Sequence, residues 1–98
     1  MIHARKDYNR FQDPALENPE LLGEGSTPIG EDEPVFLLRA RDEHFQRMLM
    51  FYALLVEEDN SSDMVSAVMA HKKLSREWQE KHGTKTPDMP KEVRQDVR

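Results

Sequence analysis

The sequence predicts an all-α fold in which an N-terminal arm precedes a long antiparallel two-helix hairpin. Between Pro34 and Gly83 the chain contains neither Gly nor Pro, and its apolar residues recur three and four positions apart, as in amphipathic helices. The turn signal within that stretch is Asp59–Asn60, a pair that suits a tight turn. Because the connection is short, the two helices are expected to be antiparallel neighbours.

Residues 1–30 form the predicted arm. Pro14, Pro19 and Pro28, together with glycines between positions 23 and 30, divide it into turns and leave room for at most one helical turn, near residues 14–17. The arm also carries apolar side chains that need burial, so we expect it to be ordered rather than to act as a linker. These side chains are Tyr8, Phe11, Leu16, Leu21, Leu22 and Ile29.

The hairpin is predicted to span residues 31–83, with its first helix beginning at the sequence GEDEP. Asp32 is a candidate N-cap, its acidic neighbours suit the positive end of a helix dipole, and Pro34 needs no amide partner in a first turn. From there to about Glu58 one broad apolar face is predicted, formed by Leu38, Phe45, Met48, Leu49, Tyr52, Leu55 and Val56. Further apolar residues do not fit on that face: Val35, Phe36, Leu37, Met50, Phe51 and Leu54.

The second helix is predicted to begin at Ser61 or Ser62, either of which can cap it, and to end at Gly83. We interpret His71 as a buried histidine that is hydrogen-bonded in the seam between the helices. The helices are expected to be roughly 25 and 22 residues long, and residues 84–98 are expected to form a C-terminal tail. The apolar stripe of the second helix comprises Met64, Ala67, Val68, His71, Leu74 and Trp78.

Composition and surplus apolar surface predict the oligomeric state of the protein, its cellular location and the absence of DNA binding. A two-helix hairpin has one seam, so the apolar surface left over on the first helix predicts a homo-oligomer. The absence of cysteine excludes disulfides and thiolate zinc sites, and it favours a reducing, cytoplasmic location. No membrane span or signal peptide is expected. With a net charge of −5, binding to DNA is not expected, because it requires many phosphates to be neutralised.

The sequence lacks the common catalytic and metal-binding motifs. Its four histidines show no HExxH spacing, and there is no GxSxG elbow, P-loop or GxGxxG. Glu77 and Glu80 form one ExxE step of the kind with which all-α nucleotide pyrophosphohydrolases hold magnesium, but the second step is missing. We therefore predict no enzyme activity, no bound metal and no cofactor.

The segment RKDYNRFQDP, at residues 5–14, is the best candidate for ligand binding. The Tyr8 ring can stack on a nucleobase, Arg10 offers a forked donor for phosphate, and Asn9 offers a donor and an acceptor to a base edge. The loop GEGSTP adds the hydroxyls of Ser26 and Thr27 and exposed backbone amides. The alternative is that the rings of this segment only fix the arm to the hairpin while its cations remain solvated.

Several blocks follow one another in a characteristic order: YNRFQDP, a variable loop, IGEDEPVFLLRARDEHF, a hairpin with MVSAVMAHKKLSREWQ in its second helix, and KTPDMP. Over about residues 7–90 the chain resembles the phage anti-CBASS cyclic-oligonucleotide sponges, whose hairpin domain is shared with a class of anti-Thoeris sponges. The resemblance implies a non-catalytic homohexamer that binds cyclic dinucleotides such as 3′,3′-cyclic GMP-AMP between protomers. Some members also bind cyclic trinucleotides at separate sites.

The resemblance implies a function in phage immune evasion. In the cytoplasm of the infected bacterial host, such a protein sequesters the second messengers of CBASS immunity without cleaving them. Two other functions stay open, namely a helical protein–protein interaction module and, with less support, an all-α nucleotide hydrolase. The residues that the resemblance assigns to ligand binding are Tyr8 as the stacking platform, Asn9, Arg10, Ser26 and Thr27 as polar contacts, and Arg39, which alternatively bridges protomers.

Overall fold

The computed structural model describes residues 1–86 of the chain, which fall into two compact units. The first unit contains Met1–Leu37 and is called the arm unit below. The second begins at Leu38 and contains both long helices, and it is called the hairpin unit. Most of the predicted C-terminal tail, residues 87–98, lies outside the described residues.

The arm unit contains two very short strands and three short 3-10 helices. Strand β1 (Ile2–His3) pairs in parallel with β2 (Pro34–Val35), and Ile2 lies opposite Pro34. The 3-10 helices are η1 (Lys6–Arg10), η2 (Pro14–Leu16) and η3 (Pro19–Leu21). The arm is therefore ordered, but the all-α prediction missed the strand pair, because two-residue strands are too short to show an alternating pattern.

The predicted start of the first helix is wrong. Instead of capping a helix, the acidic residues after Gly30 form a turn, in which Glu33 N donates to Gly30 O at 3.2 Å and Glu33 Oε1 accepts from Gly30 N at 3.3 Å. Pro34 then begins β2, a place where its missing N–H costs nothing. The helix begins later, after Asp42, whose Oδ1 accepts a 2.7 Å hydrogen bond from His44 N.

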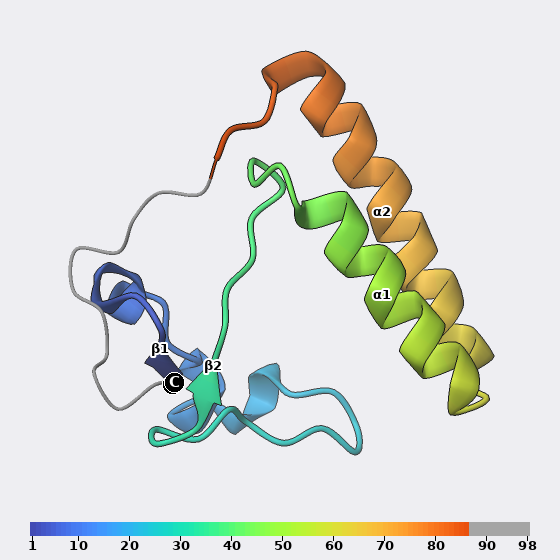
Figure 1. Cartoon of the computed structure of the whole chain (residues 1–98). Helices are drawn as coiled ribbons and strands as arrows, with labels where there is room; N and C mark the ends of the chain where they lie inside the picture. Colours follow the sequence, from blue (N-terminus) through green and yellow to red (C-terminus); the bar gives the residue numbers. More distant parts are fainter. Residues whose placement is uncertain (87–98) are drawn as a thin grey trace. The chain divides into compact units, whose positions relative to one another are not determined.

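The hairpin itself agrees with the sequence prediction. Helices α1 (Phe45–Glu58) and α2 (Ser62–His82) pack side by side along their length (Figure 1). Asn60 makes the tight turn with a φ of 59°, a left-handed conformation that Asn tolerates better than most residues. Gly83 ends α2 with a φ of 76°, and its N–H bonds to the Gln79 carbonyl at 2.7 Å.

The seam between the helices is narrower than predicted. Phe45, Val56 and Val68 are buried as expected, and they are joined by Ala53 on α1 and by Ser75 on α2. The prediction for several other members of the two apolar faces is wrong, since Met48, Tyr52, Leu55, Met64 and Leu74 are exposed.

His71 also differs from its predicted role. Its side chain is exposed, although its ring meets the edge of the Phe45 ring with centroids 6.2 Å apart. Its carbonyl oxygen accepts a 2.6 Å hydrogen bond from the Ser75 hydroxyl within α2. On this part of α2 the seam is formed instead by Val68, as predicted, and by Ser75, which the pattern did not include.

A backbone clamp holds the chain before α1 against the end of α2. Lys85 N donates to Arg41 O at 2.9 Å, and Glu43 N donates to Lys85 O at 3.0 Å. The Gln79 side-chain amide donates to Ala40 O at 2.7 Å, so a main-chain carbonyl oxygen is the acceptor in each of these hydrogen bonds. Arg41 also lies over the Trp78 ring, 4.9 Å from its centroid.

Among residues 1–86, no helix has the length and apolar character needed to cross a membrane.

Candidate functional site

The Tyr8 ring is the centre of a cluster of cations and aromatic side chains on η1. Arg5 lies over the ring with its Cζ 4.5 Å from the centroid, and its Nη1 donates to the Tyr8 hydroxyl at 3.3 Å. Arg5 also forms a two-pronged ion pair with Asp7, with N···O distances of 3.0 Å and 2.6 Å. These side-chain hydrogen bonds from Arg5 hold the pKa of Asp7 below its usual value of 3.8.

The remaining surroundings of Tyr8 are aromatic and cationic. The Phe11 ring lies 5.8 Å from it and the His3 ring 6.3 Å, in tilted and edge-on arrangements. Arg10 lies over Phe11 at 4.5 Å and near Tyr8 at 5.7 Å. As a result Tyr8 is only 7 % exposed, whereas Arg10 remains accessible to solvent.

His3 supports the cluster from β1. Its ring is buried, and its Nε2 pairs with the Phe11 carbonyl oxygen at 2.7 Å. The other ring nitrogen, Nδ1, has no hydrogen-bond partner within residues 1–86. This histidine therefore fixes the chain on both sides of η1, because it ties the start of the arm to the residue that follows the 3-10 helix.

The structure places the predicted ligand residues in different surroundings. Asn9 and Arg10 are exposed neighbours of the buried Tyr8 on η1. Ser26 and Thr27 are exposed on the loop of the same unit, where Gly25 adopts a φ of 78° and Ser26 N donates to Gly23 O at 3.1 Å. Within residues 1–86, neither the Ser26 nor the Thr27 side chain makes a hydrogen bond to η1. Arg39, also exposed, belongs to the hairpin unit.

Asp13 fixes the chain on either side of the loop. Its Oδ1 accepts from Ala15 N at 3.0 Å, and its Oδ2 accepts from Ile29 N at 2.8 Å. The hydrogen bonds from the backbone of Ile29 and of Ala15 hold the pKa of Asp13 below 3.8. The carboxylate therefore closes a loop that contains both predicted hydroxyls, Ser26 and Thr27.

Sequence reasoning placed the aromatic–cation cluster on the right segment but missed the role of Arg5. Arg5 had no predicted role of its own except as a solvated cation in the alternative interpretation, whereas its guanidinium covers the Tyr8 ring. The signal is the spacing of three between Arg5 and Tyr8, since Arg5 is the N-cap of η1 and the hydrogen bond from Tyr8 N to Arg5 O closes the first turn at 3.1 Å. The same spacing brings Tyr8 next to Phe11.

The turn end of the hairpin offers a different environment. An open hollow of about 460 Å³ there is lined by Glu57, Asn60, Ser61, Ser62, Val65 and Ser66. The nearby acids Glu58, Asp59 and Asp63 add further negative charge, and residues 57–66 contain no Lys or Arg. An anionic ligand is therefore disfavoured at this end of the hairpin.

Neither metal chemistry nor a relative identifies the site. Within residues 1–86, no three His, Asp or Glu side chains come together closely enough to hold a metal ion. Comparison with protein-family models, with curated proteins and with solved structures finds no match to this chain.

Proposed function

We propose that the protein binds cyclic dinucleotides, such as 3′,3′-cyclic GMP-AMP, and sequesters them without cleavage. The observation that carries the proposal is the cluster on η1, in which guanidinium groups surround the Tyr8 ring. A cyclic dinucleotide combines two planar bases with two phosphates, and it needs stacking surfaces beside forked N–H donors. The arm supplies both within one short segment.

Ligand binding in this proposal requires a rearrangement around Tyr8. The Arg5 guanidinium occupies a ring face on which a base would stack, with its Cζ 4.5 Å from the centroid. A base takes that place when the Arg5 side chain moves off the ring, and its N–H groups then face a phosphate. Arg10 and Asn9 are already exposed beside the ring for further polar contacts.

The remaining contacts and the assembly follow the family resemblance. Ser26 and Thr27 offer exposed hydroxyls on a closed loop, and Arg39 offers a further exposed guanidinium. In the proposed homohexamer, the ligand pockets form between protomers. The protein acts in the cytoplasm of a phage-infected bacterium. Sequestration there lowers the free concentration of the CBASS second messenger, and cyclic trinucleotides are second candidates for binding.

Calorimetric titration with 3′,3′-cyclic GMP-AMP tests the proposal. Tight binding is expected for the wild-type chain, a small loss for Tyr8→Phe and a loss of roughly tenfold or more for Tyr8→Ala, since base stacking is worth about 1–3 kcal/mol. Chromatography of the nucleotide released by heat should then recover it intact. No binding, or full affinity in a folded Tyr8→Ala variant, would contradict the proposal.

A protein-interaction module is the second candidate function. The observation that favours it is the exposed apolar surface of the hairpin, which includes Phe51 at 62 % and Leu55 at 58 % exposure. In that case Tyr8→Ala leaves the activity unchanged, whereas polar substitution of Phe51 removes it. A nucleotide hydrolase is the third candidate, and it is distinguished by linear products that appear with magnesium.

A further inference from the structure

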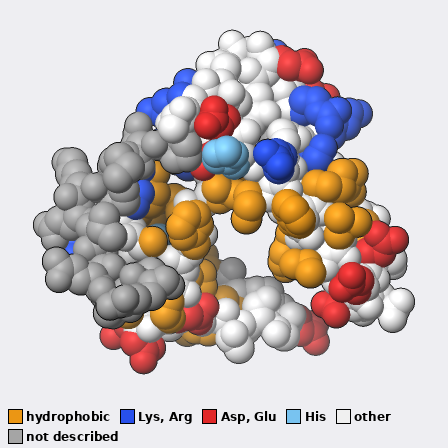
Figure 2. Space-filling view, viewed as in Figure 1, with side chains coloured by type: hydrophobic (Ala, Val, Ile, Leu, Met, Phe, Trp, Pro, Cys, Tyr) orange, Lys and Arg blue, Asp and Glu red, His pale blue; other side chains and the backbone are white. Residues whose placement is uncertain are grey.

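The side of α1 that faces away from α2 carries a regular stripe of exposed residues. Arg47, Phe51, Leu54 and Glu58 follow one another at spacings of four, three and four, so they share one helix face. Ala53 and Val56, which are buried against α2, lie on the opposite face. Figure 2 shows hydrophobic side chains gathered over the hairpin surface.

The stripe is complementary to itself when it is reversed. If a second α1 lies antiparallel with its centre between Tyr52 and Ala53, Phe51 faces Leu54 of the other copy, and Arg47 faces Glu58. Each copy therefore offers an apolar centre with a cation at one end and a carboxylate at the other.

Within residues 1–86, the charged ends of the stripe have no partner. Neither the Arg47 nor the Glu58 side chain makes a hydrogen bond or ion pair to any of residues 1–86. At the apolar centre, Phe51 and Leu54 are 62 % and 51 % exposed. Burial of these two side chains is favourable, and the flanking charges select the antiparallel orientation, because a parallel pair places like charges opposite each other.

We propose that two copies of this chain pair antiparallel through the Arg47–Phe51–Leu54–Glu58 stripe, about a two-fold axis. Such a contact is isologous, since each copy contributes the same residues, and a closed assembly follows from it. The pairing goes beyond the proposed function, because it is argued from α1 and is independent of any ligand. It is also compatible with a hexamer of dihedral symmetry, which contains two-fold axes.

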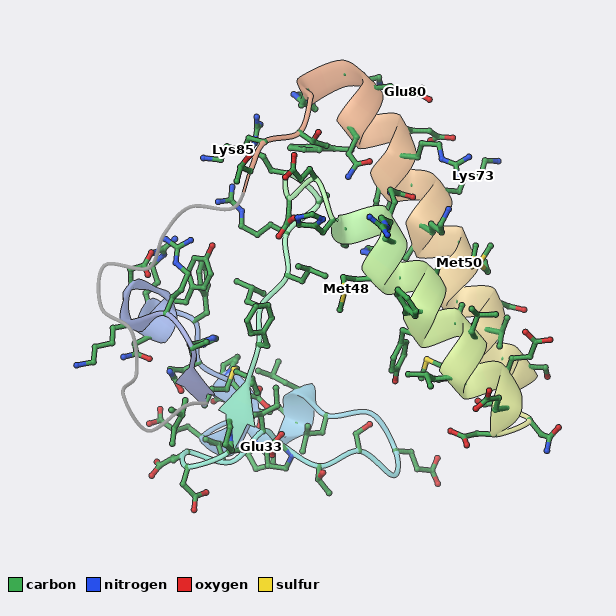
Figure 3. All side chains as sticks on the ribbon, viewed as in Figure 1. Glu33, Met48, Met50, Lys73, Glu80 and Lys85 are labelled. Carbon is green, nitrogen blue, oxygen red and sulfur yellow. The ribbon has the colours of Figure 1, made fainter. Side chains whose placement is uncertain are left out.

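Charge reversal tests the pairing by sedimentation of the ligand-free full chain at micromolar concentration. Arg47→Glu and Glu58→Arg each place like charges opposite each other twice, so each is expected to weaken association by roughly tenfold, and more at low salt. The double variant exchanges the two charges and should restore association. Lys73→Glu and Glu80→Arg serve as matched controls, because both side chains project from α2 away from α1 (Figure 3).

Disulfide cross-linking tests the orientation, since the natural chain has no cysteine. Mixed Arg47→Cys and Glu58→Cys chains should form the mixed disulfide, and either variant alone should form little disulfide. A monomeric wild-type chain, a double variant that stays dissociated, or cross-linking of each variant to itself would overturn the proposal. Since neither measurement contains nucleotide, a failure of the proposed ligand binding leaves these results unaffected.

Discussion

The two units of the molecule obtain their order in different ways. The arm unit has few buried apolar side chains, chiefly Tyr8 and Ala15, and side-chain hydrogen bonds from residues such as Asp13 and His3 fix its path. The hairpin unit is held by an apolar seam around Phe45 and leaves much of its other apolar surface exposed. The order of the arm unit therefore depends on individual polar contacts, whereas the stability of the hairpin unit depends on apolar packing.

The largest effect is expected from removal of the seam's aromatic ring. Phe45→Ala should reduce the free energy of unfolding by about 3 kcal/mol, because it leaves a cavity beside α2. Urea unfolding followed by circular dichroism measures the loss. The matched control is Phe36→Ala in the arm unit, whose ring is 76 % exposed and whose loss should be small. Equal losses of unfolding free energy for Phe45→Ala and Phe36→Ala would contradict the conclusion that the hairpin unit depends on its apolar seam.

A smaller effect is expected at the end of α2. Gly83→Ala forces a side chain into a φ of 76°, which costs about 1 kcal/mol even though the Cβ would meet no atom within 4 Å. The same unfolding experiment detects the loss. Gly23→Ala is the control, since its added Cβ would lie 3.8 Å from the Ser26 hydroxyl and its φ is not positive. Larger destabilisation at Gly23 would show that the helix end is not strained.

Loss of one carboxylate should loosen the arm without unfolding the hairpin. In Asp13→Ala the amides of Ala15 and Ile29 lose their acceptor, so both should exchange hydrogen with solvent faster. Asp13→Asn keeps one acceptor oxygen and should have an intermediate effect. Exchange at the buried α1 residue Ala53 provides the internal control and should not change. Faster exchange throughout both helices would instead show that the two units unfold together.

The smallest expected effect is a change in how the stability of the arm unit depends on pH. Backbone hydrogen bonds lower the folded-state pKa of Asp13 below 3.8, so the unfolded arm binds a proton more readily than the folded arm. This contribution to stability is fully present above pH 3.8 and is lost as the pH falls through the lower folded value. Amide exchange at Ile29 between pH 5 and pH 2 measures it. Asp13→Asn should remove that part of the pH dependence, and an unchanged profile would contradict the assignment.

The elements that sequence predicted correctly are those with local causes. Asn60 marks the turn and Gly83 marks the end of α2. Both adopt a positive φ, which depends mainly on the residue type at that position: Asn tolerates it, and Gly has no Cβ to oppose it. The predicted start of α1 failed because it depends on a distant partner, the strand β1, which pairs with Pro34–Val35. No pattern within residues 31–44 contains that information.

The candidate site was predictable only in part. The composition of residues 5–14 indicated an aromatic ring among cations, and the structure places Tyr8 and Arg10 in one cluster. The burial of Tyr8 under Arg5 depends on the 3-10 geometry of η1, which the sequence did not reveal. The hydroxyls of Ser26 and Thr27 were predicted on a loop, but the Asp13 bridge that closes it joins residues far apart in sequence.

The backbone clamp at the end of α2 has a consequence for sequence drift. Its contacts involve main-chain atoms of Arg41, Glu43 and Lys85, and the Gln79 amide also bonds to a main-chain oxygen, that of Ala40. Every residue type carries a carbonyl, and all but proline carry an N–H. The path of this segment therefore tolerates substitution wherever only main-chain atoms take part, whereas Gln79 and Arg41 are constrained by their side-chain contacts with Ala40 and Trp78.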